Sequence, residues 1–276
     1  MEIIDFHVHP PTKEFVNALG KYYETTLNYF RSKSKILAIN EIIEDLKKQG
    51  ITKAVLLPLF SALTGYGSIP NEHIKEIMKA DEELFIGFAG FSLQNPIEDL
   101  KYAIEVLGLK GIKIHPQLLG ITPDNEILNK VYEYASRKEL PIVLHTGITG
   151  IGAGNRGGGG IILDLGRPIY VDKVASKFDN VDFIMAHFGW PWYEEALAVA
   201  YHKANVYIDI SGWSPKYIPN IVFRYADSLI QDKVLFGSDY PMLNPSRIIE
   251  ELKQINLKET TIKKIFYENA RRLLKI

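Results

Sequence analysis

Two histidines, His7 and His9, are separated by one residue in the segment DFHVHP at residues 5–10. Because side chains on a β-strand alternate between its two faces, both imidazoles should point the same way, about 6.6–7 Å apart along the strand. Two imidazoles that each reach about 2.1 Å to a shared ion can bridge this separation. The spacing therefore indicates a metal site, with two unrelated polar residues at a strand end as the alternative.

The remaining histidines extend this pattern. Of the seven in the chain, five fall at the carboxyl ends of segments that read as strands: His7, His9, His115, His145 and His187. Asp239, in the segment FGSDYP, ends the last such segment. Imidazole and carboxylate ligands suit Zn²⁺, with Mn²⁺ or Fe²⁺ as alternatives, and three or four protein ligands leave a position open for catalysis. His73 and His202 fall on predicted helices, where we expect surface residues.

The elements that must position these side chains are eight short, apolar segments that alternate with helical patterns. The predicted strands cover residues 2–9, 52–59, 84–91, 110–116, 141–147, 181–189, 205–212 and 233–241. Near-continuous apolar character is typical of parallel strands buried on both faces. Eight such units predict an α/β fold, a (β/α)₈ TIM barrel in one domain over residues 1–276, with the active site at the carboxyl ends of its strands. A last helix, over residues 258–276, should pack on the outside of the barrel.

Two connections are longer than ordinary strand-to-helix turns. One covers about residues 10–39, and the other covers about 147–169 and contains AGNRGGGG. Both should emerge at the rim that carries the active site, where loops of this length are usually functional. We expect them to act as lids. The glycine run could instead cradle a phosphate, but it lacks the Lys-Ser/Thr of a P-loop.

Composition excludes several classes of protein. An apolar content of 46% and a charged content of 24% are ordinary for a globular chain. A net charge of −1 leaves no electrostatic footprint for nucleic acid or an anionic membrane. No apolar run approaches the roughly 18 residues of a membrane span, and the start does not read as a signal peptide. The absence of cysteine excludes disulfides and thiolate ligands. We expect a cytoplasmic protein.

The motifs together resemble those of the amidohydrolase superfamily. They are DxHxH on the first strand, GxKxHP on the fourth, single histidines on the fifth and sixth, and GSDYP on the eighth. More narrowly, the chain resembles the amidohydrolase-related group, which holds mononuclear metal hydrolases and aminocarboxymuconate-semialdehyde-type decarboxylases. The resemblance covers essentially the whole chain, including residues 167–190 and 205–212. It points to the fold and the metal site rather than to a substrate.

The resemblance also implies roles for individual residues. It implies one divalent ion, with Zn²⁺ expected, held by four side chains: His7, His9, His145 and Asp239. His187 would be a catalytic imidazole beside the ion. Lys113 matches a strand-four lysine that is carboxylated and bridges two ions in binuclear relatives. As alternatives, Lys113 could anchor a substrate carboxylate or serve as a hydrogen-bonded residue behind the ligands.

The expected reaction is hydrolysis of an ester, lactone or amide bond in a small anionic molecule. A metal ion lowers the pKa of water to about 7, Asp239 would take the proton as general base, and His187 would polarise the carbonyl group. Decarboxylation of an aromatic or muconate-like acid is the main alternative. A barrel that binds a metabolite without chemistry is a third possibility. DNases with similar barrels are a further rival, but they carry a strand-four glutamate where this chain has Lys113.

Four residues are expected to contact the substrate: Lys113, His115, Arg156 and Trp190. The cations Lys113, Arg156 and Arg167 indicate an anionic small molecule, and Trp190 could pack against the fold instead. The expected partner is this small-molecule substrate. Relatives often dimerise through rim loops, so a homodimer is a further expectation.

Overall fold

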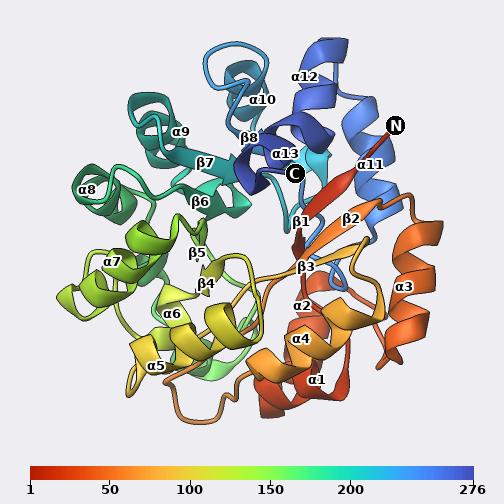
Figure 1. The fold of residues 1–276 in the computed structure, drawn as a ribbon. Helices are drawn as coiled ribbons and strands as arrows, with labels where there is room; N and C mark the ends of the chain where they lie inside the picture. Colours follow the sequence, from red (N-terminus) through yellow and green to blue (C-terminus); the bar gives the residue numbers. More distant parts are fainter.

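Eight parallel strands form a ring in the computed structural model, which describes residues 1–276 (Figure 1). They are β1 (Ile4–Val8), β2 (Lys53–Leu56), β3 (Phe85–Gly87), β4 (Ile112–Ile114), β5 (Ile142–His145), β6 (Phe183–Ala186), β7 (Val206–Asp209) and β8 (Val234–Leu235). Each lies inside the segment predicted for it and is shorter at both ends. The predicted (β/α)₈ barrel is therefore the observed architecture.

Two seams close the ring. Hydrogen bonding gives a three-stranded sheet, β1-β2-β3, and a five-stranded sheet that runs from β4 to β8 in order. Parallel bridges join Ala89 to Ile112 at one seam and Val8 to Tyr240 at the other. At the second seam the amide of His9 donates to the carbonyl oxygen of Tyr240 at 2.7 Å. Closure of this seam brings the segment after β8 next to the end of β1.

Helices surround the strands, and the colours of Figure 1 follow the chain once around the ring. The outer helices are α3 (Ile39–Lys48), α4 (Asn71–Ala80), α5 (Pro96–Lys101), α7 (Asn129–Lys138), α8 (Ile169–Lys177), α9 (Tyr193–His202), α10 (Asn220–Ala226) and α11 (Pro245–Lys253). Their apolar residues recur at helical spacing, as with Ile42 and Leu46 of α3, and this face is buried. None of these helices has the length and apolar character needed to cross a membrane.

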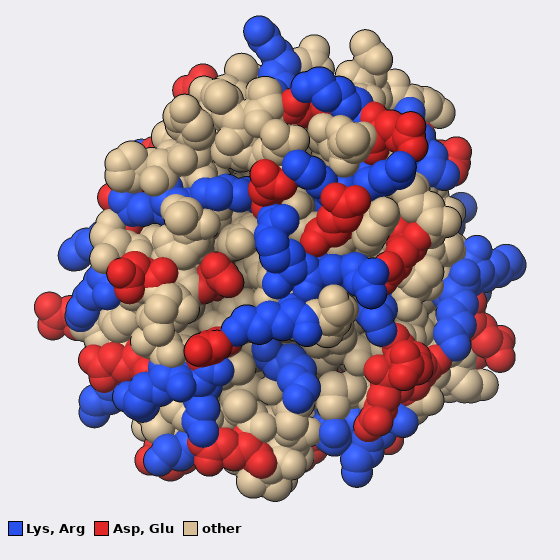
Figure 2. Space-filling view, turned by 45° about the horizontal axis from the view of Figure 1, so that its top comes forward, with Lys and Arg blue, Asp and Glu red and all other residues tan.

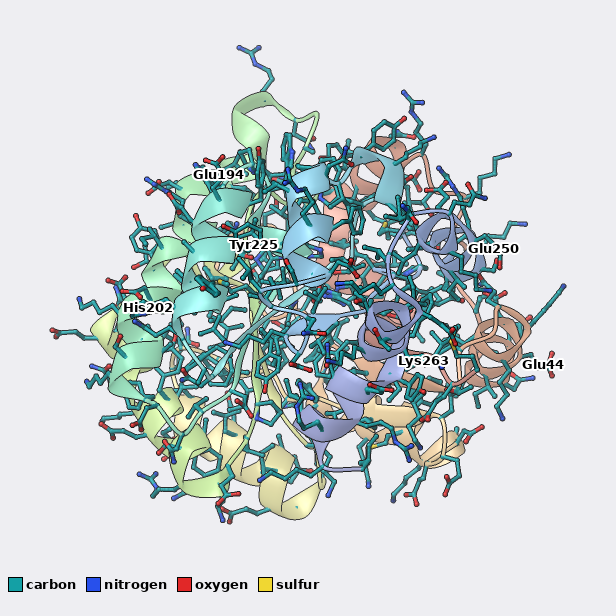
Figure 3. The ribbon with its side chains drawn as sticks, turned by 90° about the horizontal axis from the view of Figure 1, so that it is seen from above. Glu44, Glu194, His202, Tyr225, Glu250 and Lys263 are labelled. Carbon is teal, nitrogen blue, oxygen red and sulfur yellow. The ribbon has the colours of Figure 1, made fainter.

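The molecular surface is charged with both signs. Figure 2 shows Lys and Arg side chains interspersed with Asp and Glu over one face. In Figure 3, Glu44 of α3, His202 of α9 and Glu250 of α11 lie at the periphery of the molecule. His202 is exposed, as expected for a surface residue, whereas His73 of α4 is half-buried and its ring pairs with Glu76 at 3.0 Å.

The end of the chain closes one end of the barrel. It forms α12 (Glu259–Lys263), a π-helical turn (Lys264–Glu268) and α13 (Asn269–Leu274). Ala270 and Leu273 of α13 belong to a buried cluster that otherwise contains only strand residues and their immediate continuations, such as Ile4, Phe6 and Leu235. This differs from the expected position outside the barrel. The apolar side chains inside the ring need a cover at this end, and α13 supplies it, as Figure 1 shows.

The two long connections carry structure of their own. The first contains α1 (Lys13–Leu19) and α2 (Tyr23–Phe30), and the second contains 3₁₀ turns at Arg156–Gly160 and Leu163–Gly166. A short helix, α6 (Pro116–Leu119), follows β4 on the same rim. The two connections touch, because Asn155 donates a hydrogen bond to the hydroxyl group of Thr25 at 2.9 Å. Whether they open and close as lids stays a prediction.

Candidate metal centre

His7, His9 and Asp239 meet where the ends of β1 and β8 lie side by side. One ligand atom from each lies within 4.8 Å of the other two, and all three residues are buried. The Nε2 atoms of His7 and His9 are 3.8 and 3.6 Å from Oδ1 of Asp239. These separations are too long for hydrogen bonds. Three buried ligand atoms that converge without bonding one another fit a divalent cation, and their chemistry suits it.

The second nitrogen of each imidazole is already occupied. His7 donates through Nδ1 to Oδ2 of Asp209 at 2.9 Å, and His9 donates through Nδ1 to the carbonyl oxygen of Leu57 at 2.7 Å. Both acceptors require the proton on Nδ1, which leaves each Nε2 atom with a lone pair. That of His9 has no hydrogen-bond partner, and that of His7 lies 3.3 Å from Nζ of Lys113, which an ion would displace. This is how proteins commonly orient imidazole ligands of metals.

A bulge in β1 turns both histidines into the barrel. The pairing of β1 with β2 shifts register between Asp5 and Val8. Within the bulge, Oδ1 of Asp5 accepts from the backbone amide of His7 at 3.1 Å. The same oxygen accepts from the amide of Ser238 at 2.9 Å, one residue before Asp239. One buried carboxylate thus fixes β1 and the segment after β8 relative to each other.

His187 is held by two residues of β7 and its continuation. Its Nδ1 atom lies 2.9 Å from Oγ of Ser211, and that hydroxyl group donates to Asp209. The backbone amide of His187 donates to Oδ1 of Asp209 at 3.0 Å. If the hydroxyl proton points to Asp209, His187 donates from Nδ1, and its Nε2 atom, 3.2 Å from His145, can exchange a proton.

Two of the candidate residues have unusual backbones. His187 has φ of 60° and Asp239 has φ of 67°, in the left-handed region that non-glycine residues rarely adopt. Such conformations persist only where the surrounding structure imposes them, and they concentrate at functional sites. Beside them, Gly212 has φ of +76°, and a Cβ there would lie 2.7 Å from Nδ1 of His187. Only glycine permits this approach.

Burial controls the charges of the centre. It lowers the pKa of His9 to about 3 and that of His187 to about 4, so both rings are neutral at pH 7. Burial raises the pKa of Asp239 to about 7. Burial alone would raise the pKa of Asp209 too, but the adjacent His7 holds it below its usual range. A divalent cation favours neutral imidazoles and ionised carboxylates, so it would counter the shift of Asp239.

A cavity lies above the centre and is bounded by both long connections. The cavity and its open mouth together contain about 580 Å³ of empty space. Its floor contains His9, His115, His145, His187 and Asp239. Its walls and roof comprise Phe15, Leu19, Thr26, Tyr29, Phe30, Leu59, Ile148, Thr149, Gly150, Ile151, Gly212, Trp213 and Met242. The arrangement could hold a small molecule against the metal centre.

The predicted ligands and the catalytic imidazole form one cluster of rings. His7 and His187 have centroids 4.6 Å apart. His145 lies beside His187, with its Nδ1 atom 3.2 Å from Nε2 of that ring, rather than in the group formed by His7, His9 and Asp239. The structure therefore brings all five residues together, while their roles as ligands stay predictions.

Of the four residues expected to contact the substrate, only His115 lines the cavity. Lys113 precedes it by two residues on the inward face of β4, so its ammonium group lies deeper, 3.3 Å from Nε2 of His7. Arg156 is exposed on its loop. Trp190 packs on Trp213 with a centroid distance of 4.7 Å, behind the cavity wall.

The remaining cation expected near an anionic substrate is also engaged elsewhere. Arg167 forms an ion pair with Glu195, and its guanidinium group lies over the ring of Trp192, 5.8 Å from the centroid. No lysine or arginine lines the cavity. The nearest ammonium group is that of Lys113, 3.3 Å from Nε2 of His7, and contact of these cations with a substrate stays a prediction.

The sequence reading missed Asp209 and Ser211, which orient His7 and His187. The signal was available, because the segment YIDIS places two polar residues at alternate positions at the end of an apolar strand. That is the pattern by which His7 and His9 were identified. The same holds for Asp5, whose carboxylate lies behind the centre.

Comparison with known proteins gives the family and the fold. A family model described as amidohydrolase matches residues 4–276. An uncharacterized TIM-barrel protein from Bordetella bronchiseptica superposes with a TM-score of 0.85 at 22% identity, covering 100% of this chain and 99% of that one. The comparison with curated proteins yields no match.

Two solved decarboxylases are also similar in structure. The 2,6-dihydroxybenzoate decarboxylase from Rhizobium has a TM-score of 0.72 at 16% identity, covering 100% of this chain and 99% of that one. The 5-carboxyvanillate decarboxylase from Novosphingobium aromaticivorans, complexed with manganese and 4-hydroxy-3-methoxy-5-nitrobenzoic acid, has a TM-score of 0.74 at 16% identity over 100% and 96% of the two chains. At these identities the likeness concerns the barrel fold.

Proposed function

The chain belongs to the amidohydrolase family, and we propose that it is a metal-dependent hydrolase that cleaves an ester, lactone or amide bond of a small molecule. His7, His9 and Asp239 would hold one divalent ion, with His145 as a fourth ligand. Zn²⁺ fits this set of nitrogen and oxygen donors, and Mn²⁺ or Fe²⁺ would fit it too. When bound, the ion supplies Lewis-acid chemistry, because it makes water more acidic and polarises a carbonyl group.

The protein's own groups would move the protons. Asp239 borders the cavity and would accept a proton from the attacking water as general base. His187, whose Nδ1 atom is held by Ser211 at 2.9 Å, would receive this proton at Nε2 and deliver it to the leaving group. Lys113, behind His7, would offset the negative charge of Asp209 and Asp239.

The observation that carries this proposal is the presence of two separately positioned proton carriers on the cavity floor. Hydrolysis removes one proton from water and adds one to the leaving group, so it uses both Asp239 and His187. Their backbones are fixed independently, at the ends of β8 and β6, in left-handed conformations. Decarboxylation needs only one proton, which is added to carbon.

Decarboxylation of an aromatic or muconate-like acid is the second candidate. It is favoured by aromatic side chains in the cavity wall, including Phe15, Tyr29, Phe30 and Trp213. It is also favoured by the two similar decarboxylases, which are named for hydroxylated aromatic acids. In that reaction the substrate carboxylate would face the metal centre, and Asp239 would protonate the ring carbon.

One assay separates the two candidates. Metal-loaded protein would be incubated with aryl esters and lactones, and in parallel with hydroxylated benzoic acids. We expect acid release from an ester or lactone, lost in His187→Ala and retained in His202→Ala, whose side chain is exposed on α9. Release of CO₂ from an aromatic acid, without turnover of any ester, would establish the decarboxylase instead.

A further inference from the structure

The cavity above the metal centre has a wall without charge. Its roof consists of side chains from α1, α2 and the loop after β5, with Trp213 and Met242 at the side. The polar roof groups are neutral: the hydroxyl group of Thr26 donates to Tyr22 at 2.8 Å, and that of Thr149 accepts from the amide of Ile151 at 3.1 Å. Asp239 is the only lining residue that can carry a full negative charge.

The basic side chains on the strand and loops around the cavity do not line it. Lys113 is 3% exposed, and its ammonium group lies 3.3 Å from Nε2 of His7, which does not line the cavity. Arg156 is exposed, and Arg31 faces a different groove, which runs along Leu243 and Asn244. A charged group placed against the roof would lose its water without gaining a partner, which is strongly unfavourable.

One polar side chain in the cavity lacks any partner. Both ring nitrogens of His115 are buried without a hydrogen bond, and the residue is 4% exposed. Its ring stacks on that of His145 at 3.9 Å with an interplanar angle of 12°, which fixes its orientation. Buried polar groups are nearly always bonded, so this ring is a candidate for a ligand. A neutral imidazole offers one donor and one acceptor, as an amide or ester requires.

We propose that the substrate is an uncharged molecule with an apolar body about the size of one substituted ring, whose polar group is hydrogen-bonded by His115. The apolar body would lie between Phe30 and Trp213, and the bond to be cleaved would face Asp239. This inference rests on the proposed function, because it takes the cavity as the substrate site. It replaces the anionic substrate expected from Lys113 and Arg156.

Calorimetry with metal-loaded protein tests the charge preference by binding, with the ligands assayed afterwards to verify that the amides are intact. The ligands are 4-ethylbenzamide and 4-(aminomethyl)benzamide, which differ by an ammonium group at the end remote from the amide. We expect the neutral ligand to bind at least tenfold more tightly. Phe30→Glu should narrow this ratio by stabilising the ammonium group, and Phe30→Leu, the apolar control, should preserve it. Equal or tighter binding of the ammonium ligand to the wild type, or no binding of the neutral one, would overturn the proposal.

A pair of esters tests whether the cavity also disfavours a substrate with a negative charge at the end remote from the ester. Methyl 4-ethylbenzoate should have a kcat/KM at least tenfold above that of monomethyl terephthalate, and Phe30→Arg should raise the second value. Faster turnover of the terephthalate by the wild type would contradict an uncharged substrate. If no ester, lactone or amide is hydrolysed, the proposed function fails, while the calorimetric result still decides the charge preference.

His115→Phe tests the hydrogen bond while keeping an aromatic ring against His145. We expect at least fivefold weaker binding of 4-ethylbenzamide, with unchanged metal content and an unchanged melting temperature. His202→Phe, the same substitution at an exposed position on α9, should bind as the wild type does. Unchanged affinity in His115→Phe would remove the role assigned to this residue. Loss of the metal would also overturn it, by making His115 a ligand.

Discussion

His7 and Asp209 form a buried pair across the barrel, with Nδ1 of the imidazole 2.9 Å from Oδ2 of the carboxylate and neither side chain exposed. The pair does more than join β1 to β7. Because Asp209 also accepts from the backbone amide of His187, a single carboxylate orients the predicted ligand on β1 and the predicted catalytic ring after β6. The position of Asp209 thus links metal binding to catalysis.

Replacing this carboxylate should weaken both functions. In Asp209→Asn, we expect metal affinity to fall by about 10–100-fold, because His7 loses the acceptor that fixes its tautomer. The free energy of unfolding should fall by about 1.5–3 kcal/mol, the usual contribution of a buried hydrogen bond to a charged group. Metal titration and urea denaturation measure the two effects. Asp179→Asn, at an exposed position, is the control and should change neither. Wild-type metal affinity in Asp209→Asn would show that the pair is not needed to orient His7.

Removing the catalytic imidazole should affect turnover more than binding. We expect His187→Ala to lower kcat by about a hundredfold or more, as loss of a transition-state hydrogen bond does. Ser211→Ala should have a smaller effect of about tenfold on kcat, with little change in KM, because the ring loses only its support. Steady-state kinetics on the best ester gives both values. Equal rates in His187→Ala and wild type would exclude His187 from the reaction.

The metal-free protein should lose stability in mild acid. The pKa of His9, about 3, and that of His187, about 4, lie below the unfolded value of about 6.5, so the unfolded chain binds more protons as the pH falls below 6.5. Asp5 and Asp239, with pKa values raised to about 7, act in the opposite direction, because they are protonated first in the folded state. Burial also lowers the pKa of three further imidazoles: His7, His115 and His145.

Because the imidazoles outnumber the carboxyl groups, the net effect between pH 6.5 and 5.5 should be a loss of about 1–4 kcal/mol. Urea denaturation of chelator-treated protein at several pH values measures this slope. His9→Asn should make the slope shallower, and His202→Asn, an exposed control, should leave it unchanged. A metal-free protein that becomes more stable over this interval would contradict the assignment of neutral buried rings.

The roof of the cavity depends on a glycine. A Cβ at Gly150 would lie 2.3 Å from Cε2 of Phe30 and 2.9 Å from Cδ1 of Tyr29. Gly150→Ala should therefore displace Phe30, cost about 1–3 kcal/mol of stability, and raise KM severalfold with a smaller effect on kcat. Adding Phe30→Leu should relieve the clash and recover part of the stability. A wild-type KM in Gly150→Ala alone would mean that the substrate does not contact this part of the roof.

The barrel was predictable because its strands are short apolar runs, several of which end in histidine or aspartate. What escaped prediction lies in local departures from strand geometry. Ala186, the last residue of β6, points into the barrel, so strict alternation would point His187 outward. The left-handed backbone of His187 turns its ring into the site instead. The bulge in β1 likewise depends on the side chain of Asp5. The hydrophobic pattern of the sequence predicts neither the left-handed backbone nor the bulge.

The substrate residues show a second limit of sequence reasoning. Lys113 and His115 share the inward face of β4, and alternation alone could not tell which of them reaches the cavity. Arg156 is predicted to contact an anionic substrate group when its loop closes, and in this structure the glycines that follow it have left-handed backbones and its side chain is exposed. Position along the strand decided the first case and the backbone of the glycine run decided the second, and residue types alone give neither.

Metal analysis of the purified protein tests the central claim most directly. After dialysis against Zn²⁺ or Mn²⁺ and removal of free ion, the wild type should retain one ion per chain, His7→Ala and His9→Ala should retain almost none, and His202→Ala should match the wild type. If the two variants bind as much metal as the wild type, or the wild type binds none, then the residues that meet at the ends of β1 and β8 are not a metal centre.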